Sequence, residues 1–157
     1  MLLFFTGFSR VADTIAAQKI SNLGRRAKQL EAMLQMVPEA AAILQDPDRP
    51  LREIGMMLRE SWKMKKELAD CVSNGCIDQI YDAAMQAGAW GGKLLGAGGG
   101  GFMLLLAEPS CQDKIRLALK GLIEVSFQIG SLGSTIVICE LDGLEERRFA
   151  SVSATRR

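Results

Sequence analysis

The segment GAWGGKLLGAGGGGFMLLLAEP, residues 88–109, contains eight of the chain's 16 glycines and then turns into an apolar run. Each glycine costs about 0.5–1 kcal/mol relative to alanine where regular structure would serve. A helix end or a tight connection needs only one or two, so residues 98–101 predict a loop that requires bare backbone. Two reasons remain open: successive positive φ angles that form a nest of N–H groups for an anion, or a neighbour packed too close for any Cβ.

The sequence after the glycines predicts a buried strand, a helix and a hairpin. Residues 102–107 are continuously apolar, which is typical of a buried strand. EPS follows as a turn, with Ser110 as the expected N-cap of a helix that carries Ile115 on its apolar face. Residues 124–129 and 135–141, joined by GSLG, predict a β-hairpin.

The sequence before the glycines is mostly helical. The short aromatic-rich stretch at residues 2–8 predicts a strand. Apolar residues at helical spacing then predict helices from Arg10 to the loop QDPDRP at residues 45–50, with Pro38 opening a further turn.

Two more helices are expected ahead of the loop. Ile54, Leu58 and Trp62 at i, i+4 and i+8 predict an amphipathic helix over residues 51–72, with Trp62 in the core. Another helix begins near Ile77 and is expected to run directly into the glycine segment.

This order of elements predicts an α+β two-layer domain. We expect a variant of the ferredoxin-like arrangement, with a four-stranded, largely antiparallel sheet and helices packed on it. Residues 1–144 are expected to form this domain. Residues 145–157 have few apolar groups and predict a disordered tail.

Composition excludes several classes of function. The 19 Lys and Arg residues balance the 18 Asp and Glu residues, and no basic stripe is present, so nucleic acid is not an expected partner. The four cysteines form no CxxC pair and the chain has no histidine, so no metal site is predicted. No apolar run approaches the ~20 residues of a membrane span, which favours a cytoplasmic protein.

The glycine loop imitates two phosphate-binding motifs without their context. Gly96, Gly98 and Gly101 match GxGxxG by letter, but a dinucleotide fingerprint follows a strand and opens a helix. Here a helix is expected before the loop and a strand after it. A Walker A loop on Lys93 fails as well, because residues 87 and 94 are Ala and Leu.

The same residues carry a family resemblance. GGKLLGAGGGGF closely resembles the third motif of the GHMP kinases, which include galactokinase, homoserine kinase, mevalonate kinase and phosphomevalonate kinase. LLFFTGFSR and LREIGMMLRESWKMKKELAD resemble the opening strand and middle helix of the C-terminal domain of that family. CIDQIYDAAMQAGAWGGKLLGAGGGGF resembles the branch that acts on D-glycero-D-manno-heptose 7-phosphate and related sugars, and the resemblance covers residues 2–141.

The resemblance implies ATP-dependent phosphoryl transfer to a sugar or sugar phosphate, with ATP and Mg²⁺ as cofactors of the complete enzyme. The active site of such kinases lies between two domains, and the N-terminal one brings a PxxxGLGSSxA loop and the acidic residues. No such segment occurs in this sequence. We therefore expect the substrate-side half of a kinase, without bound cofactor or turnover alone, whose partner is the N-terminal ATP-binding domain. Its uncovered apolar surface predicts dimers.

Carried over residue by residue, the resemblance assigns a phosphate and substrate loop to Gly96, Ala97, Gly98, Gly99, Gly100 and Gly101. It marks as further candidates for substrate binding Thr6, Ser9, Arg10 and Lys93. Arg10 would pair with an anionic sugar phosphate. Bland alternatives remain for three of these: Ser9 as an N-cap with Arg10 exposed, and Lys93 as a solvated lysine at a helix end. No catalytic or metal-binding residue is assigned.

A second class of function stays open. A free-standing module that binds a small molecule or dimerises, without catalysis, fits the same fold, because fold alone does not fix function.

Overall fold

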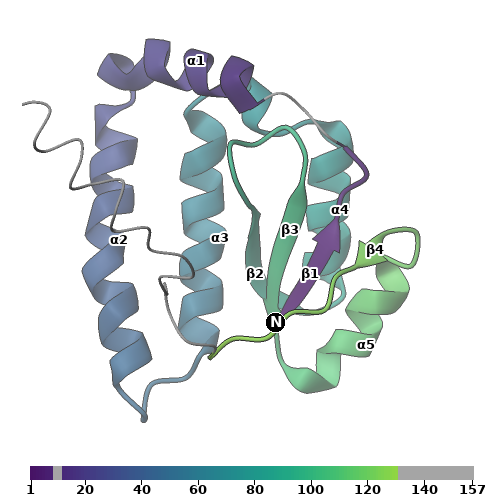
Figure 1. Ribbon diagram of the computed structural model, residues 1–157. Coiled ribbons are helices and arrows are strands. Elements are labelled where there is room, and N and C mark those ends of the chain that lie inside the picture. Colours follow the sequence, from purple (N-terminus) through teal and green to yellow (C-terminus); the bar gives the residue numbers. More distant parts are fainter. Residues whose placement is uncertain (9–11, 131–157) are drawn as a thin grey trace, which may run out of the picture. The chain divides into compact units, whose positions relative to one another are not determined.

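Figure 1 shows the computed structural model of the protein, which describes residues 1–8 and 12–130. Residues 1–127 form one compact unit. Its elements in chain order are β1 (Leu2–Phe5), α1 (Ala12–Asn22), the 3₁₀ turn η1 (Leu23–Arg25), α2 (Ala27–Gln45), α3 (Arg52–Glu67), the 3₁₀ turn η2 (Asp70–Val72), α4 (Gly75–Gln86), β2 (Ala89–Leu94), β3 (Phe102–Ala107), α5 (Pro109–Ala118) and β4 (Ile123–Glu124).

The four strands form one antiparallel sheet in the order β2-β3-β1-β4. Leu105 in β3 lies opposite Leu2 in β1 and opposite Gly92 in β2. The predicted α+β class and the four-stranded antiparallel sheet are therefore confirmed.

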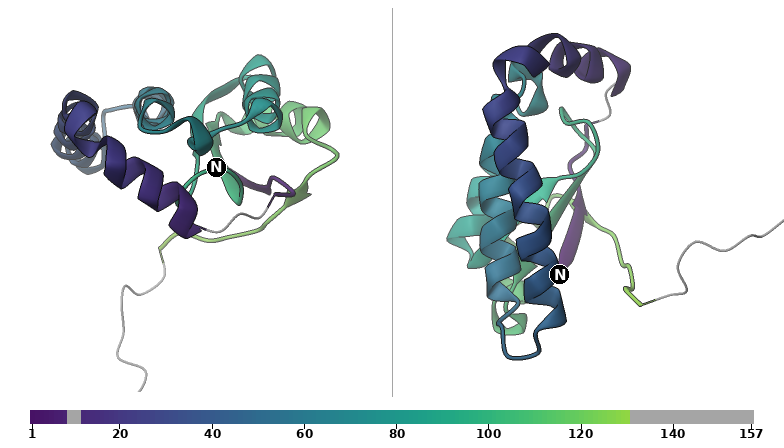
Figure 2. Two further views of the ribbon diagram at one scale, coloured as in Figure 1. Left: turned by 90° about the horizontal axis from the view of Figure 1, so that it is seen from above. Right: turned by 90° about the vertical axis from the view of Figure 1, so that its left-hand side faces the viewer.

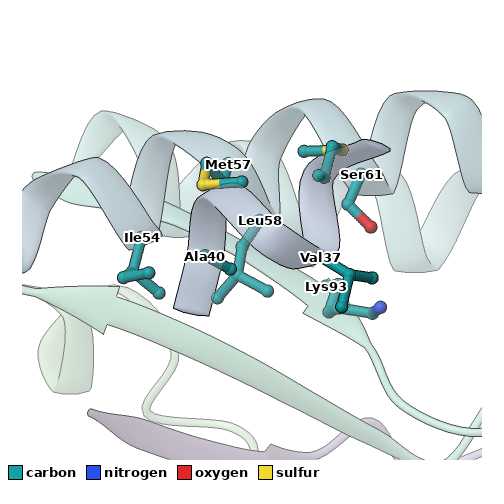
Figure 3. Close-up of a pocket in the computed structure, with 8 residues that line it drawn as sticks. Val37, Ala40, Ile54, Met57, Leu58, Ser61 and Lys93 are labelled. Carbon is teal, nitrogen blue, oxygen red and sulfur yellow. The ribbon is translucent and has the colours of Figure 1, made fainter. Parts of the chain in front are cut away.

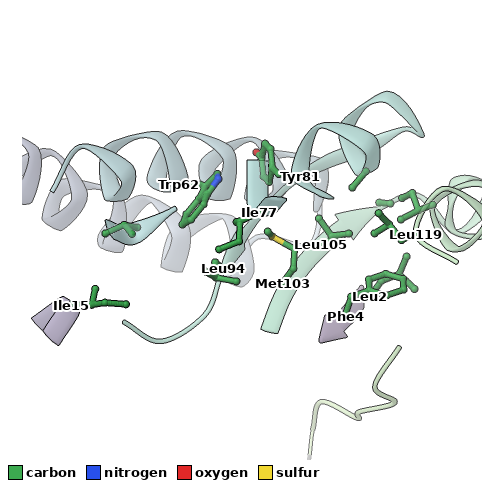
Figure 4. Packing of buried hydrophobic residues seen from close by; sticks show 14 of the residues in the cluster. Leu2, Phe4, Ile15, Trp62, Ile77, Tyr81, Leu94, Met103, Leu105 and Leu119 are labelled. Atoms are coloured by element: carbon green, nitrogen blue, oxygen red, sulfur yellow. The ribbon is translucent and has the colours of Figure 1, made fainter. Parts of the chain in front are cut away.

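Helices cover one face of this sheet (Figure 2). Strand residues alternate between faces, and those facing the helices are almost fully buried: Leu2, Phe4, Met103 and Leu105 are each at most 2% exposed. They pack in one cluster with Trp62, Ile77 and Ile115 from α3, α4 and α5 (Figure 4). The predicted core position of Trp62 agrees with its 1% exposure.

The segment before the glycine loop is a strand, which the sequence reading missed. Helix α4 ends at Gln86, Gly88 adopts a φ of 105°, and β2 begins at Ala89. The glycine loop is thus the turn of the β2–β3 hairpin and not a link from a helix to a strand. The dinucleotide fingerprint remains excluded, because a strand and not a helix follows the loop.

Glycines in β2 allow this strand to lie close to the backbones of α3 and β3. A Cβ built on Gly91 would be 1.8 Å from the carbonyl oxygen of Gly55 in α3, and one on Gly92 would be 2.3 Å from the carbonyl oxygen of Leu104. These two glycines therefore serve the packing of the fold.

Several predicted boundaries differ from the structure. The first strand ends at Phe5, and the long helix ends at Glu67, where η2 takes over. Pro38 lies inside α2. The N-cap of α5 is Glu108, because Pro109 occupies the first turn, where its missing N–H is tolerated, so the assignment of Ser110 was wrong.

Only the start of the predicted hairpin falls in the described part of the chain. Ile123–Glu124 pair with β1, and the backbone N–H of Val125 donates to the carbonyl of Leu3. The predicted strand at 135–141 and the predicted tail at 145–157 lie outside the described residues. No helix that the structure describes has the length and apolarity needed to cross a membrane.

Candidate functional site

Positive φ angles shape the hairpin loop at residues 95–101. The N–H of Leu95 donates to the carbonyl of Phe102 at 2.8 Å and closes the hairpin. Within the loop the φ angles are 67° at Gly96, 118° at Gly98, 73° at Gly99 and 101° at Gly101. Residues other than glycine rarely adopt positive φ angles. The backbone conformation of the loop therefore requires glycine at these four positions.

Close neighbours add a second requirement at two positions. A Cβ on Gly98 would be 2.9 Å from the Cα of Val72 in η2, and a Cβ on Gly100 would be 2.5 Å from the carbonyl oxygen of Phe8. Gly96 has open space around its Cβ position. Positive φ therefore requires glycine at four positions of the loop and a close neighbour requires it at Gly98 and Gly100, so both requirements meet at Gly98.

Part of the loop's hydrogen-bonding capacity is used within the domain. The N–H of Gly99 donates to the carbonyl of Val72 at 2.8 Å, and the N–H of Gly101 donates to the carbonyl of Phe8 at 2.9 Å. These two amides are therefore not available to a ligand. The described residues supply no acceptor for the amides of four other positions, Gly96, Ala97, Gly98 and Gly100.

Two lysines hold the carbonyl side of the loop. The ammonium of Lys65 in α3 donates to the carbonyls of Leu94 at 2.8 Å and Gly96 at 2.7 Å. The ammonium of Lys19 in α1 donates to the carbonyl of Ala97. Lys65 and Lys19 thus bring two positive charges to the carbonyls of Leu94, Gly96 and Ala97.

Lys65 is a buried cation, only 7% exposed, and no carboxylate of the described residues forms an ion pair with it. The pKa of Lys65 is lowered from 10.5 to about 8, chiefly by burial and in addition by the nearby charges of Lys19 and Lys93. Burial also lowers the pKa of Lys19.

The depressed pKa of Lys65 predicts a pH dependence of stability. Between pH 8 and 10 the unfolded chain binds more protons at this site than the folded chain, so stability rises with pH. We expect the wild-type protein to gain roughly 1–3 kcal/mol relative to Lys65→Met across this window. Urea unfolding at pH 7, 8, 9 and 10 measures it. Lys63→Met, an exposed change on the same helix, should follow the wild type, and a parallel curve for Lys65→Met would contradict the assignment.

Thr6 anchors the far end of the loop. It is 2% exposed, and both its N–H and its hydroxyl donate to the carbonyl of Gly101 at 2.9 Å. The structure therefore brings Thr6 to the predicted loop, with its hydroxyl already engaged. Ser9 and Arg10 lie outside the described residues.

Lys93 lies on β2, so its interpretation as a helix-end lysine was wrong. It borders a cavity of about 270 Å³ between α2 and α3 (Figure 3). The cavity is lined by Met36, Val37, Ala40, Ile54, Met57, Leu58, Ser61 and Lys93.

Metal binding finds no support in the described part of the chain. Residues 1–8 and 12–130 hold no group of three His, Cys, Asp or Glu residues that could bind an ion.

Comparison with known proteins finds relatives over about three quarters of the chain. The family described as "GHMP kinases C terminal" matches residues 40–124. D-glycero-alpha-D-manno-heptose 7-phosphate kinase of Campylobacter jejuni is 34% identical over 120 residues, which are 76% of this chain and 35% of that protein. The bifunctional fucokinase/GDP-fucose pyrophosphorylase of Arabidopsis thaliana is 30% identical over 116 residues, 73% of this chain and 11% of that protein.

Solved structures show the same fold. Mevalonate kinase of L. major, in complex with R-mevalonate, superposes with a TM-score of 0.65 at 22% identity, over 76% of this chain and 37% of that chain. The chain thus spans about a third of the length of the heptose 7-phosphate kinase and of this mevalonate kinase.

Proposed function

Because the chain belongs to the GHMP kinase family and has the fold of its C-terminal domain, we propose that it is the substrate-side half of an ATP-dependent sugar or sugar-phosphate kinase. The observation that carries the proposal is the glycine loop. Its remaining amides point to no acceptor in the described residues, while its carbonyls are held by Lys19 and Lys65.

Such a loop suits phosphoryl transfer, which depends on positioning and on neutralising negative charge in the transition state. In this proposal the amides of Gly96, Ala97, Gly98 and Gly100 face the transferred phosphate or the substrate. Gly99, Gly101 and Thr6 fix the loop from within the domain. ATP supplies the phosphoryl group, and an N-terminal ATP-binding domain supplies the phosphate cradle and the Mg²⁺ ligands.

A heptose phosphate is the proposed substrate class. The 34% identical relative carries that substrate in its name, and its similarity extends over 120 residues that include most of the described unit. The proposal includes residues 1–144 as the domain and the cytoplasm as its location. Ser9 and Arg10, which lie outside the described residues, remain candidates for contact with the substrate.

The direct test of this function is complementation. We expect the isolated chain, mixed with ATP, Mg²⁺ and D-glycero-D-manno-heptose 7-phosphate, to form no product above background. Adding a separately expressed N-terminal half of a heptose phosphate kinase should restore turnover, measured by release of ADP. Turnover by the chain alone would contradict the proposal that the chain needs an N-terminal half. If no product forms with or without that half, the non-catalytic module is favoured.

The sheet face away from the helices is the proposed contact surface for a partner. Phe5 and Phe102 pack there with ring centroids 5.4 Å apart, and Phe102 and Ile123 are 40% and 66% exposed. Apolar patches of this kind promote association, and this observation also favours the second candidate function, a dimerisation module.

Self-association of the isolated chain should depend on that face. We expect light scattering to show dimers or larger species, and Phe102→Ser to shift the distribution toward monomer. Leu117→Ser is the matched control, because Leu117 is 71% exposed on α5, away from this face. A wild-type chain that is a clean monomer at micromolar concentration would contradict the prediction.

A further inference from the structure

The cavity between α2 and α3 has two chemically different ends. Ile54, Met57 and Leu58 of α3 and Ala40 of α2 form apolar walls. Ser61 and Lys93 supply a hydroxyl and an ammonium to the lining, and Figure 3 shows both on the side of the cavity away from Ile54. A ligand that fills the cavity must therefore have an apolar body and a polar head.

The charge of the polar end is positive and is not balanced by the protein. Among the ion pairs of the described residues none involves Lys93. Lys93 also lies near enough to Lys65 and Lys19 to lower their pKa. Lys93 is the cation that lines the cavity, and the charges of Lys65 and Lys19 add to the positive potential near it, which favours an anion over a neutral or cationic head group.

The walls and the volume limit the body of the ligand. Val37, on the α2 side, is 62% exposed, so an apolar occupant would remove hydrophobic surface from water. About 270 Å³ is slightly below the ~300 Å³ at which typical ligand pockets begin, so the occupant is small. Methionines such as Met57 adapt their shape to an irregular aliphatic chain.

We propose that this cavity is a binding site for a small amphipathic oxyanion, such as an alkyl phosphate or a short aliphatic carboxylate, with its head on Lys93 and Ser61. Such a ligand differs from a polar sugar, and none of the residues that line the cavity belongs to the glycine loop at residues 95–101. The proposal therefore goes beyond the proposed kinase function and does not depend on it.

Titration of the ¹⁵N-labelled chain with hexyl phosphate, methyl phosphate and 1-hexanol tests the site. Hexyl phosphate should bind at least about tenfold more tightly than methyl phosphate, because five additional methylene groups enter the apolar part. It should also bind at least about tenfold more tightly than 1-hexanol, because the head group meets Lys93. Equal affinities for the hexyl and methyl compounds would overturn the proposal, whatever the kinase assay shows.

Variants separate the two ends. Lys93→Met should lower the affinity for hexyl phosphate at least about tenfold and leave 1-hexanol unchanged. Ala40→Phe fills the apolar end and should therefore lower the affinity for hexyl phosphate to that for methyl phosphate. Lys63→Met, an exposed lysine paired with Glu60, should bind as the wild type does. If Lys93→Met also binds as the wild type does, the head group lies elsewhere and the proposal is wrong.

Discussion

Replacing Gly91 with valine is expected to lower the free energy of unfolding by at least about 3 kcal/mol, the upper part of the usual cost of overpacking. The new Cβ would lie 1.8 Å from the carbonyl oxygen of Gly55, closer than any real contact. Gly91 is a buried residue of β2 where this strand packs on α3. The clash can therefore be relieved only by moving the helix or the strand. Valine favours strands, and local propensity alone would predict the opposite sign.

Urea unfolding of the isolated chain measures this effect. Gly121→Ala is the matched control, because its Cβ meets no atom within 4 Å and its φ is not positive. We expect the control to remain within about 0.5 kcal/mol of the wild type, as surface changes usually do. A Gly91→Val protein that unfolds at the same urea concentration as the control would show that α3 does not pack on β2 in this way.

The contrast between α3 and β2 shows what the sequence could predict. The helical spacing of Ile54, Leu58 and Trp62 predicts α3, because a half-buried helix needs an apolar stripe. Strand β2 has no such pattern. Its centre is Gly91-Gly92-Lys93, where bare backbone replaces apolar side chains in the contacts, so hydrophobic periodicity has nothing to detect.

For the candidate site, the sequence predicted that the loop requires glycine. It did not predict which side chains hold the loop in place. Four successive glycines signal a constrained path, and the structure gives both positive φ and close neighbours there. Lys65 is different, since a lysine in KMKKE is typical of a solvated face. Only the tertiary structure shows that its ammonium reaches the carbonyls of Leu94 and Gly96, 29 and 31 residues away.

Gly98 is the position where a small substitution should most affect catalysis in the complete two-domain kinase. Gly98→Ala would place a Cβ 2.9 Å from the Cα of Val72, at a φ of 118° that alanine does not readily adopt. The loop must shift, and with it the amides of Ala97 and Gly100 that the proposal aims at phosphate. A displacement of about 1 Å can cost about 100-fold in rate, and we expect a loss of that order in kcat.

Gly96→Ala distinguishes displacement of the loop from strain in its backbone dihedral angles. Its φ of 67° also disfavours alanine, but its Cβ meets no atom within 4 Å. The expected penalty is the left-handed strain of about 1–2 kcal/mol in stability, with a much smaller loss of kcat than Gly98→Ala shows. Steady-state kinetics of both variants, beside urea unfolding of each, give the comparison. Equal losses of kcat would show that the contact between Gly98 and Val72 does not set the loop position, because Gly96 has no neighbour at its Cβ position.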